Sequence, residues 1–215
     1  RLSSRRTFGS NPNICYQIAL STSRESPHIT HKSPSWTELA RKLSTPTRTL
    51  ETFAEYLAMS KDEQCAVKDV GSFVAGTFKG FKRRKDKQVN RTLLTLDIDE
   101  PGVSWPELRG AVKAEFVGLQ YAAHTTHKHC FEQPRLRVVF TLSRPVDDLE
   151  YQALSRRIAE GLDPEMTWVG RCSFDFSRLM FWPSAAVDGE FEAWSNDGVI
   201  LDVDDELAHY VDYTD

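Results

Sequence analysis

The amino-acid sequence predicts a mixed α/β (α+β) domain built around one central sheet. Residues 92–99 alternate between apolar and polar side chains, as a half-buried strand does. Ser104 and Glu107 form a capping box with Pro106 in the first turn, which predicts a helix to about residue 115. Another apolar strand follows at residues 117–123. Strand-helix-strand crossovers give parallel strands, so we expect these two strands to be parallel neighbours.

The remaining elements follow from the same two signals, periodicity and capping boxes. Leu50, Phe53 and Leu57 recur at helical spacing, which predicts a helix there. Further strands are expected at residues 14–20, 73–78, 136–142, 179–182 and 191–194, and further helices at residues 36–43, from residue 60, and at 147–162. The chain then divides into an N-terminal α/β flank or lobe (1–69), a catalytic core (70–201) and an acidic tail or linker (202–215).

Composition excludes some classes of protein. With 215 residues, 40% hydrophobic and 27% charged, the chain has an ordinary globular composition. No apolar run approaches the roughly 20 residues that cross a bilayer, so no membrane partner is expected, and we expect a cytoplasmic location. The four cysteines are scattered, which is typical of reduced thiols.

Net charge neither requires nor excludes nucleic acid. The formal charge is −4, but six acids and no Lys or Arg follow residue 201, so the rest of the chain carries +2.

Two aspartates close the strand at residues 92–99. Alternate side chains of a strand share a face, so Leu96 and Ile98 face the core while Asp97 and Asp99 share the other side. Neighbouring carboxylates repel each other unless a cation lies between them, and Mg²⁺ or Mn²⁺ prefers such ligands. The pair is a candidate metal site, with two solvated acids as the alternative.

Three histidines and a lysine follow the strand at residues 117–123. The segment reads His124-Thr-Thr-His-Lys-His-Cys130. Its side chains suit phosphate groups, a zinc site that includes Cys130 is a second interpretation, and exposed histidines are a third.

Arg135 and Arg137 share one face of the strand expected at residues 136–142. Guanidinium groups bind phosphate in a bidentate manner, so the pair suits a polyphosphate. Charges on an exposed strand edge are the alternative.

Asp175 stands between Phe174 and Phe176. An unpaired charge in apolar surroundings is costly, so a metal ion would explain it. A capping role beside two core aromatics is the alternative.

Together these motifs resemble the archaeo-eukaryotic primase superfamily. Its pattern is a hydrophobic strand that ends D-x-D, then a small residue two positions before a histidine, then a hydrophobic residue and an acid. Here these are Leu96-Asp-Ile-Asp99, Thr125-Thr-His127 and Phe174-Asp175. The resemblance is closer to primase-polymerase domains of prophages and other mobile elements, which accompany virulence-associated E or D5-like helicases. Lys68-Asp-Val-Gly71, Pro134-Arg-Leu-Arg137, Arg178-Leu-Met-Phe-Trp-Pro-Ser184 and Asn196-Asp-Gly198 carry it.

The resemblance implies an RRM-like catalytic sheet with an N-terminal, largely helical α/β unit. It implies a nucleotidyltransferase, a DNA primase-polymerase that uses dNTPs or NTPs on a single-stranded DNA template and primer. A helicase domain or subunit is a further expected partner. The implied site holds two Mg²⁺ or Mn²⁺ ions on Asp97, Asp99 and Asp175, and binds nucleotide through Thr125, His127, Arg135 and Arg137.

A basic run connects the strands at residues 73–78 and 92–99. A hairpin with this charge would follow a DNA backbone, and a solvated hairpin tip is the alternative. The candidate DNA-binding residues are Lys79, Lys82, Arg83, Arg84 and Lys85.

Two other functions stay open. One is a rolling-circle-type (HUH-like) replication initiator endonuclease, for which His127 and His129 supply paired histidines and Tyr151 the nucleophile. The other is a non-catalytic single-stranded DNA-binding module.

Overall fold

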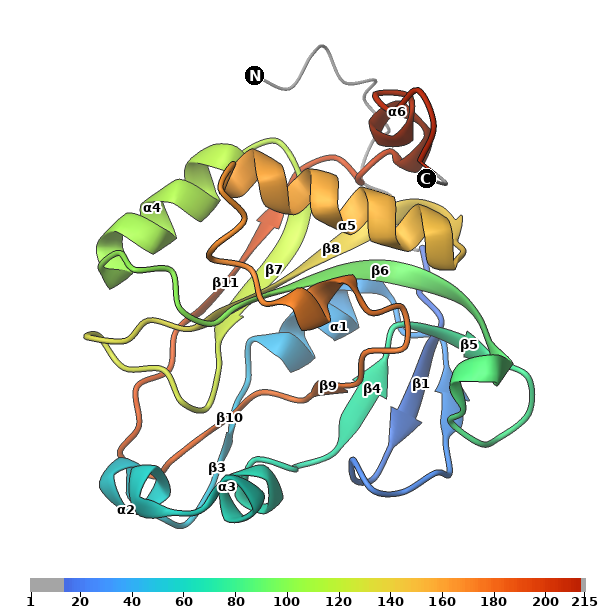
Figure 1. Ribbon diagram of the computed structural model, residues 1–215. Coiled ribbons are helices and arrows are strands. Elements are labelled where there is room, and N and C mark those ends of the chain that lie inside the picture. The colour runs from blue at the N-terminus through green and yellow to red at the C-terminus, as the bar shows by residue number, and fades with distance from the viewer. Residues whose placement is uncertain (1–13, 214–215) are drawn as a thin grey trace.

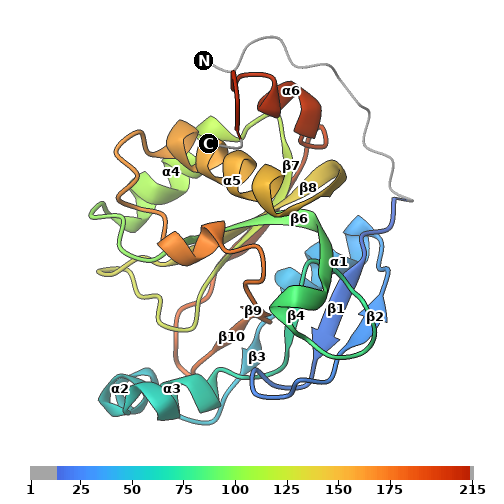
Figure 2. The same ribbon diagram turned by 45° about the vertical axis from the view of Figure 1, so that its right-hand side comes forward.

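The computed structural model describes residues 14–213, in which a central five-stranded sheet carries a layer on each face (Figure 1). α4 (Trp105–Glu115) and α5 (Asp148–Leu162) cover one face, and α1 (Trp36–Leu43) lies on the other (Figure 2). The mixed α/β class is therefore confirmed. In spatial order the strands are β11 (Ala193–Asp197), β7 (Gln120–Thr125), β8 (Leu136–Val146), β6 (Gln88–Ile98) and β5 (Gly76–Phe78).

The central sheet is built on an RRM-like unit. β6, α4, β7, β8 and α5 follow the β-α-β-β-α order, and β8 pairs antiparallel with both β6 and β7. The expectation that β6 and β7 are neighbours is wrong. The apolar strand β8, buried along its first seven residues, takes the central place between them. Because both flank β8 in the same direction, their carboxyl ends still meet at one end of the sheet.

The face under α4 and α5 is the main core. Leu94, Leu96 and Ile98 of β6 point into it, as their alternation predicts. They pack against helix residues that are all buried: Trp105, Leu108, Val112, Tyr151, Leu154 and Ile158.

The N-terminal elements cover the opposite face of the sheet. β1 pairs antiparallel with both β2 and β4, in a second sheet of order β2-β1-β4-β9. Ile18, Trp36 and Leu39 pack in one cluster with Leu93 and Val139 of the central sheet, so the aspartate-bearing face is also buried. The N-terminal elements are β1 (Ile18–Ser21), β2 (Thr30–Lys32), β3 (Thr47–Arg48), α2 (Phe53–Ala58), α3 (Lys61–Val67) and β4 (Ser72–Val74). Two later strands join them, since β9 (Met180–Phe181) pairs with β4 and β10 (Ser184–Ala185) pairs with β3.

The strand expected at residues 73–78 is divided between the two sheets as β4 and β5. The chain crosses from one to the other at Gly76, where it passes very close to β6. A Cβ at Gly76 would overlap the backbone carbonyl of Asn90, so this crossing requires glycine.

The helix expected at residues 50–57 begins later, at Phe53. Thr52 and Glu55 form a capping box that fixes its start. Leu50 is 99% exposed, and Tyr56 is the buried residue of α2. The apolar spacing therefore predicted the helix but not its buried face.

The acidic C-terminal segment contains α6 (Val203–Leu207), capped by Asp202. Val203 and Leu207 join the main core, and Glu206 pairs with Arg157 at 2.9 Å. Among residues 14–213, no helix has the length and apolarity needed to span a membrane.

Candidate nucleotide-binding site

A cavity of about 230 Å³ opens where the carboxyl ends of β6 and β7 meet, on the sheet face that carries Asp97. The central sheet, the α2–α3 region and the segment around β9 all contribute to its walls. Its lining residues include two carboxylates and five cationic side chains, so positive charge exceeds negative charge in the cavity. These charged residues are Asp97, Asp99, Lys68, Lys128, Arg135, Arg137 and Arg178.

Asp97, Arg137 and His124 form one row across three strands. Asp97 of β6 lies opposite Arg137 of β8, and Arg137 lies opposite His124 of β7. Arg137 binds Asp97 in a bidentate manner, with Nε–Oδ1 at 2.6 Å and Nη2–Oδ2 at 3.2 Å. Burial alone would raise the pKa of Asp97, but the charge and hydrogen bonds of Arg137 outweigh burial and lower it.

Asp99 pairs with Arg135, whose Nη1 lies 2.8 Å from Asp99 Oδ1. The Asp99 side chain is 46% exposed, whereas that of Asp97 is 5% exposed. The structure thus brings together four of the residues selected from the sequence. Asp97 pairs with Arg137 of β8, and Asp99 pairs with Arg135, which directly precedes β8.

His127 is fixed by three residues. Its Nδ1 lies 2.8 Å from Ser184 Oγ, and its Nε2 lies 3.1 Å from Glu51 Oε1. The ring of Tyr56 lies against it, with centroids 4.3 Å apart. Burial lowers the pKa of His127, and the Glu51 carboxylate opposes that effect.

Two neighbours of His127, Thr125 and His129, make their contacts outside the cavity, whereas Thr126 and Lys128 line it. The hydroxyl of Thr125 accepts a hydrogen bond from the Glu192 N–H at 3.0 Å, and Thr125 is not among the residues that line the cavity. His129 packs edge-on against Trp105, and its Nδ1 accepts the Arg135 N–H at 3.1 Å. Burial lowers the pKa of both His124 and His129 to about 4, which keeps them neutral near pH 7.

Asp175 lines a different cavity, of about 520 Å³, beside α5. Its Oδ1 accepts hydrogen bonds from the backbone N–H and the hydroxyl of Ser177, both at 2.9 Å. Arg91 holds this segment against β6 by donating to the carbonyls of Phe176 and Arg178 at 3.3 and 3.1 Å. The structure therefore does not place Asp175 with Asp97 and Asp99.

The zinc site that the histidines and Cys130 suggested is not formed in the described part of the chain. Within residues 14–213, no group of three or more His, Cys, Asp or Glu side chains is arranged to hold a metal ion. A preformed zinc site around Cys130 is absent from that part of the chain, and Asp97 and Asp99 are each paired with an arginine.

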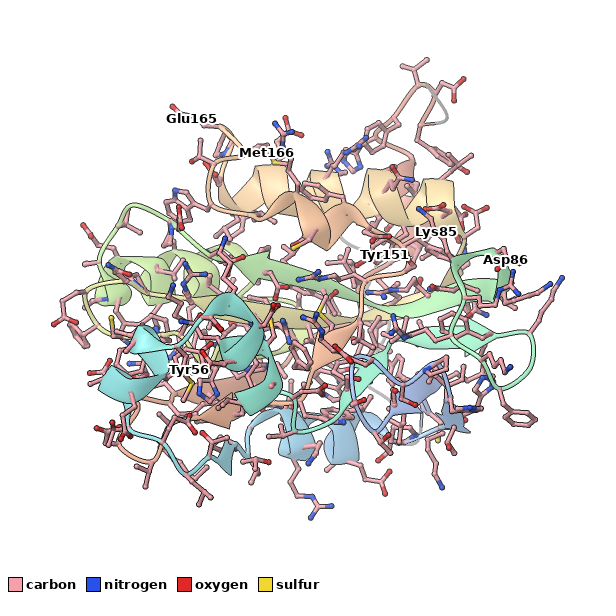
Figure 3. The ribbon with its side chains drawn as sticks, turned by 60° about the horizontal axis from the view of Figure 1, so that its bottom comes forward. Tyr56, Lys85, Asp86, Tyr151, Glu165 and Met166 are labelled. Carbon is pink, nitrogen blue, oxygen red and sulfur yellow. The ribbon has the colours of Figure 1, made fainter. Side chains whose placement is uncertain are left out.

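The basic run lies in the β5–β6 hairpin, as its position in the sequence predicted. Figure 3 shows Lys85 and Asp86 of this hairpin on the opposite side of the view from Tyr56 of the cavity. Arg83 is engaged locally, since its Nη2 donates to the carbonyl of Arg24 at 2.6 Å. Arg84 pairs with Asp86 at 3.0 Å. None of the five candidate DNA-binding residues, Lys79, Lys82, Arg83, Arg84 and Lys85, lines the cavity.

The arrangement does not support an endonuclease nucleophile at Tyr151. This tyrosine is fully buried on α5 (Figure 3). Its hydroxyl accepts from Arg91 at 3.0 Å and donates to the Ser173 carbonyl at 3.2 Å. An attack on DNA requires an exposed hydroxyl, which Tyr151 lacks.

The model of the VapE N-terminal domain matches residues 6–215, nearly the whole chain. The chain belongs to the VapE N-terminal domain family. The match confirms the resemblance to domains of virulence-associated E proteins that the sequence motifs indicated.

Among solved structures, the chain is similar to the AEP domain (PP-N190) of the cyanophage S-2L primase-polymerase (PrimPol). The identity is 11%, the alignment covers 90% of this chain and 88% of that chain, and the TM-score is 0.45. No curated protein sequence matches this VapE N-terminal domain.

Sequence reasoning missed five residues of the site. Lys68, Arg178 and Ser184 lie inside the segments that carried the resemblance, so those segments were the available signal. Glu51 and Tyr56 carried no signal, because only the fold brings them to His127.

Proposed function

We propose that this VapE N-terminal domain is a DNA primase-polymerase that adds nucleotides from dNTPs or NTPs on a single-stranded DNA template. One observation carries the proposal: two aspartates at a strand end share a cavity with five cationic side chains. Two carboxylates suit a divalent ion, and an excess of cations suits a triphosphate. The cavity therefore has the chemistry to take a metal–nucleotide complex.

The donor set fits Mg²⁺ or Mn²⁺ held by Asp97 and Asp99. Mg²⁺ commonly binds one or two carboxylates and completes its shell with water and substrate phosphates. Bound there, the ion would neutralise phosphate charge and activate the primer 3′-hydroxyl. Asp175 would add ligands for a second ion only after leaving Ser177.

The chain's own cations would bind the triphosphate. Arg137 can exchange one of its two bonds to Asp97 for a phosphate oxygen and keep the other. Lys68, Arg178 and His127 line the same cavity. Fixed positive groups of this kind stabilise the negative charge that develops on a leaving pyrophosphate.

The partners of this reaction would be the single-stranded template, a primer and the nucleotide. The β5–β6 hairpin is the proposed contact with the template backbone. A helicase domain or subunit is the proposed partner in replication of a phage or mobile element, which places the reaction in the host cytoplasm.

Primer extension and de novo synthesis assays with dNTPs or NTPs, each with Mg²⁺ or Mn²⁺, test the proposal. Asp97→Asn together with Asp99→Asn should abolish transfer and weaken Mn²⁺ binding in a titration followed by paramagnetic resonance. Asp86→Asn, on the hairpin, is the matched control and should retain both. Metal binding without any nucleotide transfer by the wild type would leave only a binding module, and transfer by the double variant would contradict the metal assignment.

A further inference from the structure

Glu51 approaches the cavity from the N-terminal part of the chain and binds a histidine 76 positions later. We infer that Glu51 is a positioning residue for the nucleotide pocket. With Ser184 it fixes His127 in one orientation with a proton on Nε2, and its carboxylate lets the ring take up a second proton when a triphosphate enters. The catalytic part of this inference rests on the proposed function, whereas the orientation and protonation of His127 do not.

Glu51 is itself held in place. The Thr49 hydroxyl donates to Glu51 Oε1 at 2.6 Å, and the Glu51 carbonyl accepts the Val187 N–H at 3.0 Å. The Glu51 side chain is 11% exposed. The Val187 bond anchors the backbone at Glu51 and the Thr49 hydroxyl holds its carboxylate. Glu51 is therefore a fixed acceptor rather than a mobile surface acid, and it can define where the His127 ring lies.

The hydrogen bonds determine the tautomer. A carboxylate only accepts, so His127 Nε2 carries the hydrogen that lies between it and Glu51. In the neutral ring Nδ1 then accepts, and the Ser184 hydroxyl donates to it. Neutral His127 therefore has both ring nitrogens satisfied by one arrangement of protons.

A second proton on His127 requires no movement of the ring. With Nδ1 protonated, Ser184 Oγ becomes the acceptor, and its hydrogen can turn to the Lys68 carbonyl, 3.5 Å away. The Glu51 carboxylate then faces a full positive charge at 3.1 Å. Both protonation states thus use the same partners, which suits a ring that gains charge as a substrate binds.

The other groups around His127 set the balance between these states. Tyr56 packs against the ring and stays neutral, because burial raises its pKa to about 12. The Lys68 charge opposes protonation of His127, and Lys128 lines the same cavity. A triphosphate would offset both lysine charges, so the proton would enter His127 together with the nucleotide.

The first experiment follows the histidine ring nitrogens by NMR in wild-type protein, Glu51→Gln and Glu190→Gln. Glu190 is the matched control, since its carboxylate lies 3.9 Å from another buried histidine, His129. Wild-type His127 should show the Nε2–H tautomer. Glu51→Gln should move its titration midpoint to lower pH by about one unit, a tenfold loss of proton affinity. Glu190→Gln should leave His127 unchanged.

The second experiment measures proton uptake on binding a non-hydrolysable triphosphate, by calorimetry in buffers of different ionisation enthalpy. Wild-type protein should take up protons, and Glu51→Gln should take up fewer and bind the nucleotide severalfold more weakly. Thr49→Val, which removes the hydroxyl that holds Glu51, should give a smaller change of the same sign. It keeps the inference testable where Glu51→Gln fails to fold.

The outcomes separate this inference from the proposed function. An Nδ1–H tautomer, or a His127 titration that Glu51→Gln leaves unchanged, overturns the inference even where primer extension succeeds. Conversely, a wild-type protein without nucleotidyl transfer but with the expected NMR shifts overturns the proposed function and leaves the role of Glu51 in orienting His127.

Discussion

At the scale of single residues, the candidate site depends on pairs of opposite charge that only the fold assembles. The shared face of Asp97 and Asp99 could be predicted, because the two-residue period of a strand is a local property. Their pairing with Arg137 and Arg135 could not, because it depends on β8 inserting between β6 and β7. The position of Asp175 could not be predicted either, because Arg91 of β6 holds the segment that follows it through the Phe176 and Arg178 carbonyls.

The Asp97–Arg137 pair yields a stability prediction. Their side chains are 5% and 10% exposed, and loss of one partner leaves a buried charge without compensation. Arg137→Gln should therefore lower the free energy of unfolding by about 3–5 kcal/mol. Urea unfolding followed by circular dichroism measures this loss.

Two further variants make that measurement specific. Asp97→Asn combined with Arg137→Gln should recover most of the loss, because neither residue is then charged. Arg135→Gln is the control, since its partner Asp99 is 46% exposed, and it should cost less than about 1 kcal/mol. Equal small losses for Arg137→Gln and Arg135→Gln would show that the Asp97 pair is not buried in solution.

At the scale of elements, local signals predicted helix starts and missed strand partners. The capping boxes at Ser35, Ser60 and Ser104 begin α1, α3 and α4 as expected, because a cap involves residues three apart. The division of residues 73–78 between two sheets was not predictable from alternation, since β4 and β5 are separated by one residue and are both largely buried. The close approach of Gly76 to Asn90 divides them, and that contact exists only in the folded sheet.

The β5–β6 hairpin gives a prediction that separates its two kinds of basic residue. Lys79, Lys82 and Lys85 are exposed, so changing them to Gln should weaken binding of single-stranded DNA. The slope of log K against log[salt] should flatten by about 0.7 per lost contact. Fluorescence anisotropy over a series of salt concentrations measures it.

Arg83→Gln is the control for the hairpin. Its guanidinium donates to the Arg24 carbonyl. This variant should therefore lower the melting temperature and leave the salt slope of DNA binding nearly unchanged. A salt slope that the triple lysine variant leaves intact would show that the hairpin only faces solvent.

At the scale of the whole molecule, the cavity joins two parts of the chain that the sequence presented as separate. The resemblance was strong over residues 70–201 and loose before them, and the family model nonetheless matches residues 6–215. Tyr56, Gln64 and Lys68 line the cavity with the sheet residues, and the second hydrophobic cluster also spans both parts. The N-terminal elements therefore complete the site as well as cover the sheet, which local periodicity cannot reveal.

This shared construction predicts one cooperative unfolding transition that a bound nucleotide shifts as a unit. Far-ultraviolet circular dichroism and tryptophan fluorescence should report the same melting temperature, because Trp36 of α1 and Trp105 of α4 lie in cores on opposite faces of one sheet. A triphosphate with Mg²⁺ at about 100 times its Kd should add about 2.7 kcal/mol, which corresponds to about 5–10 °C for a domain of this size. Asp97→Asn with Asp99→Asn should reduce that shift. Two separate transitions, or a shift in only one of the two signals, would mean that the N-terminal elements fold and bind independently of the sheet.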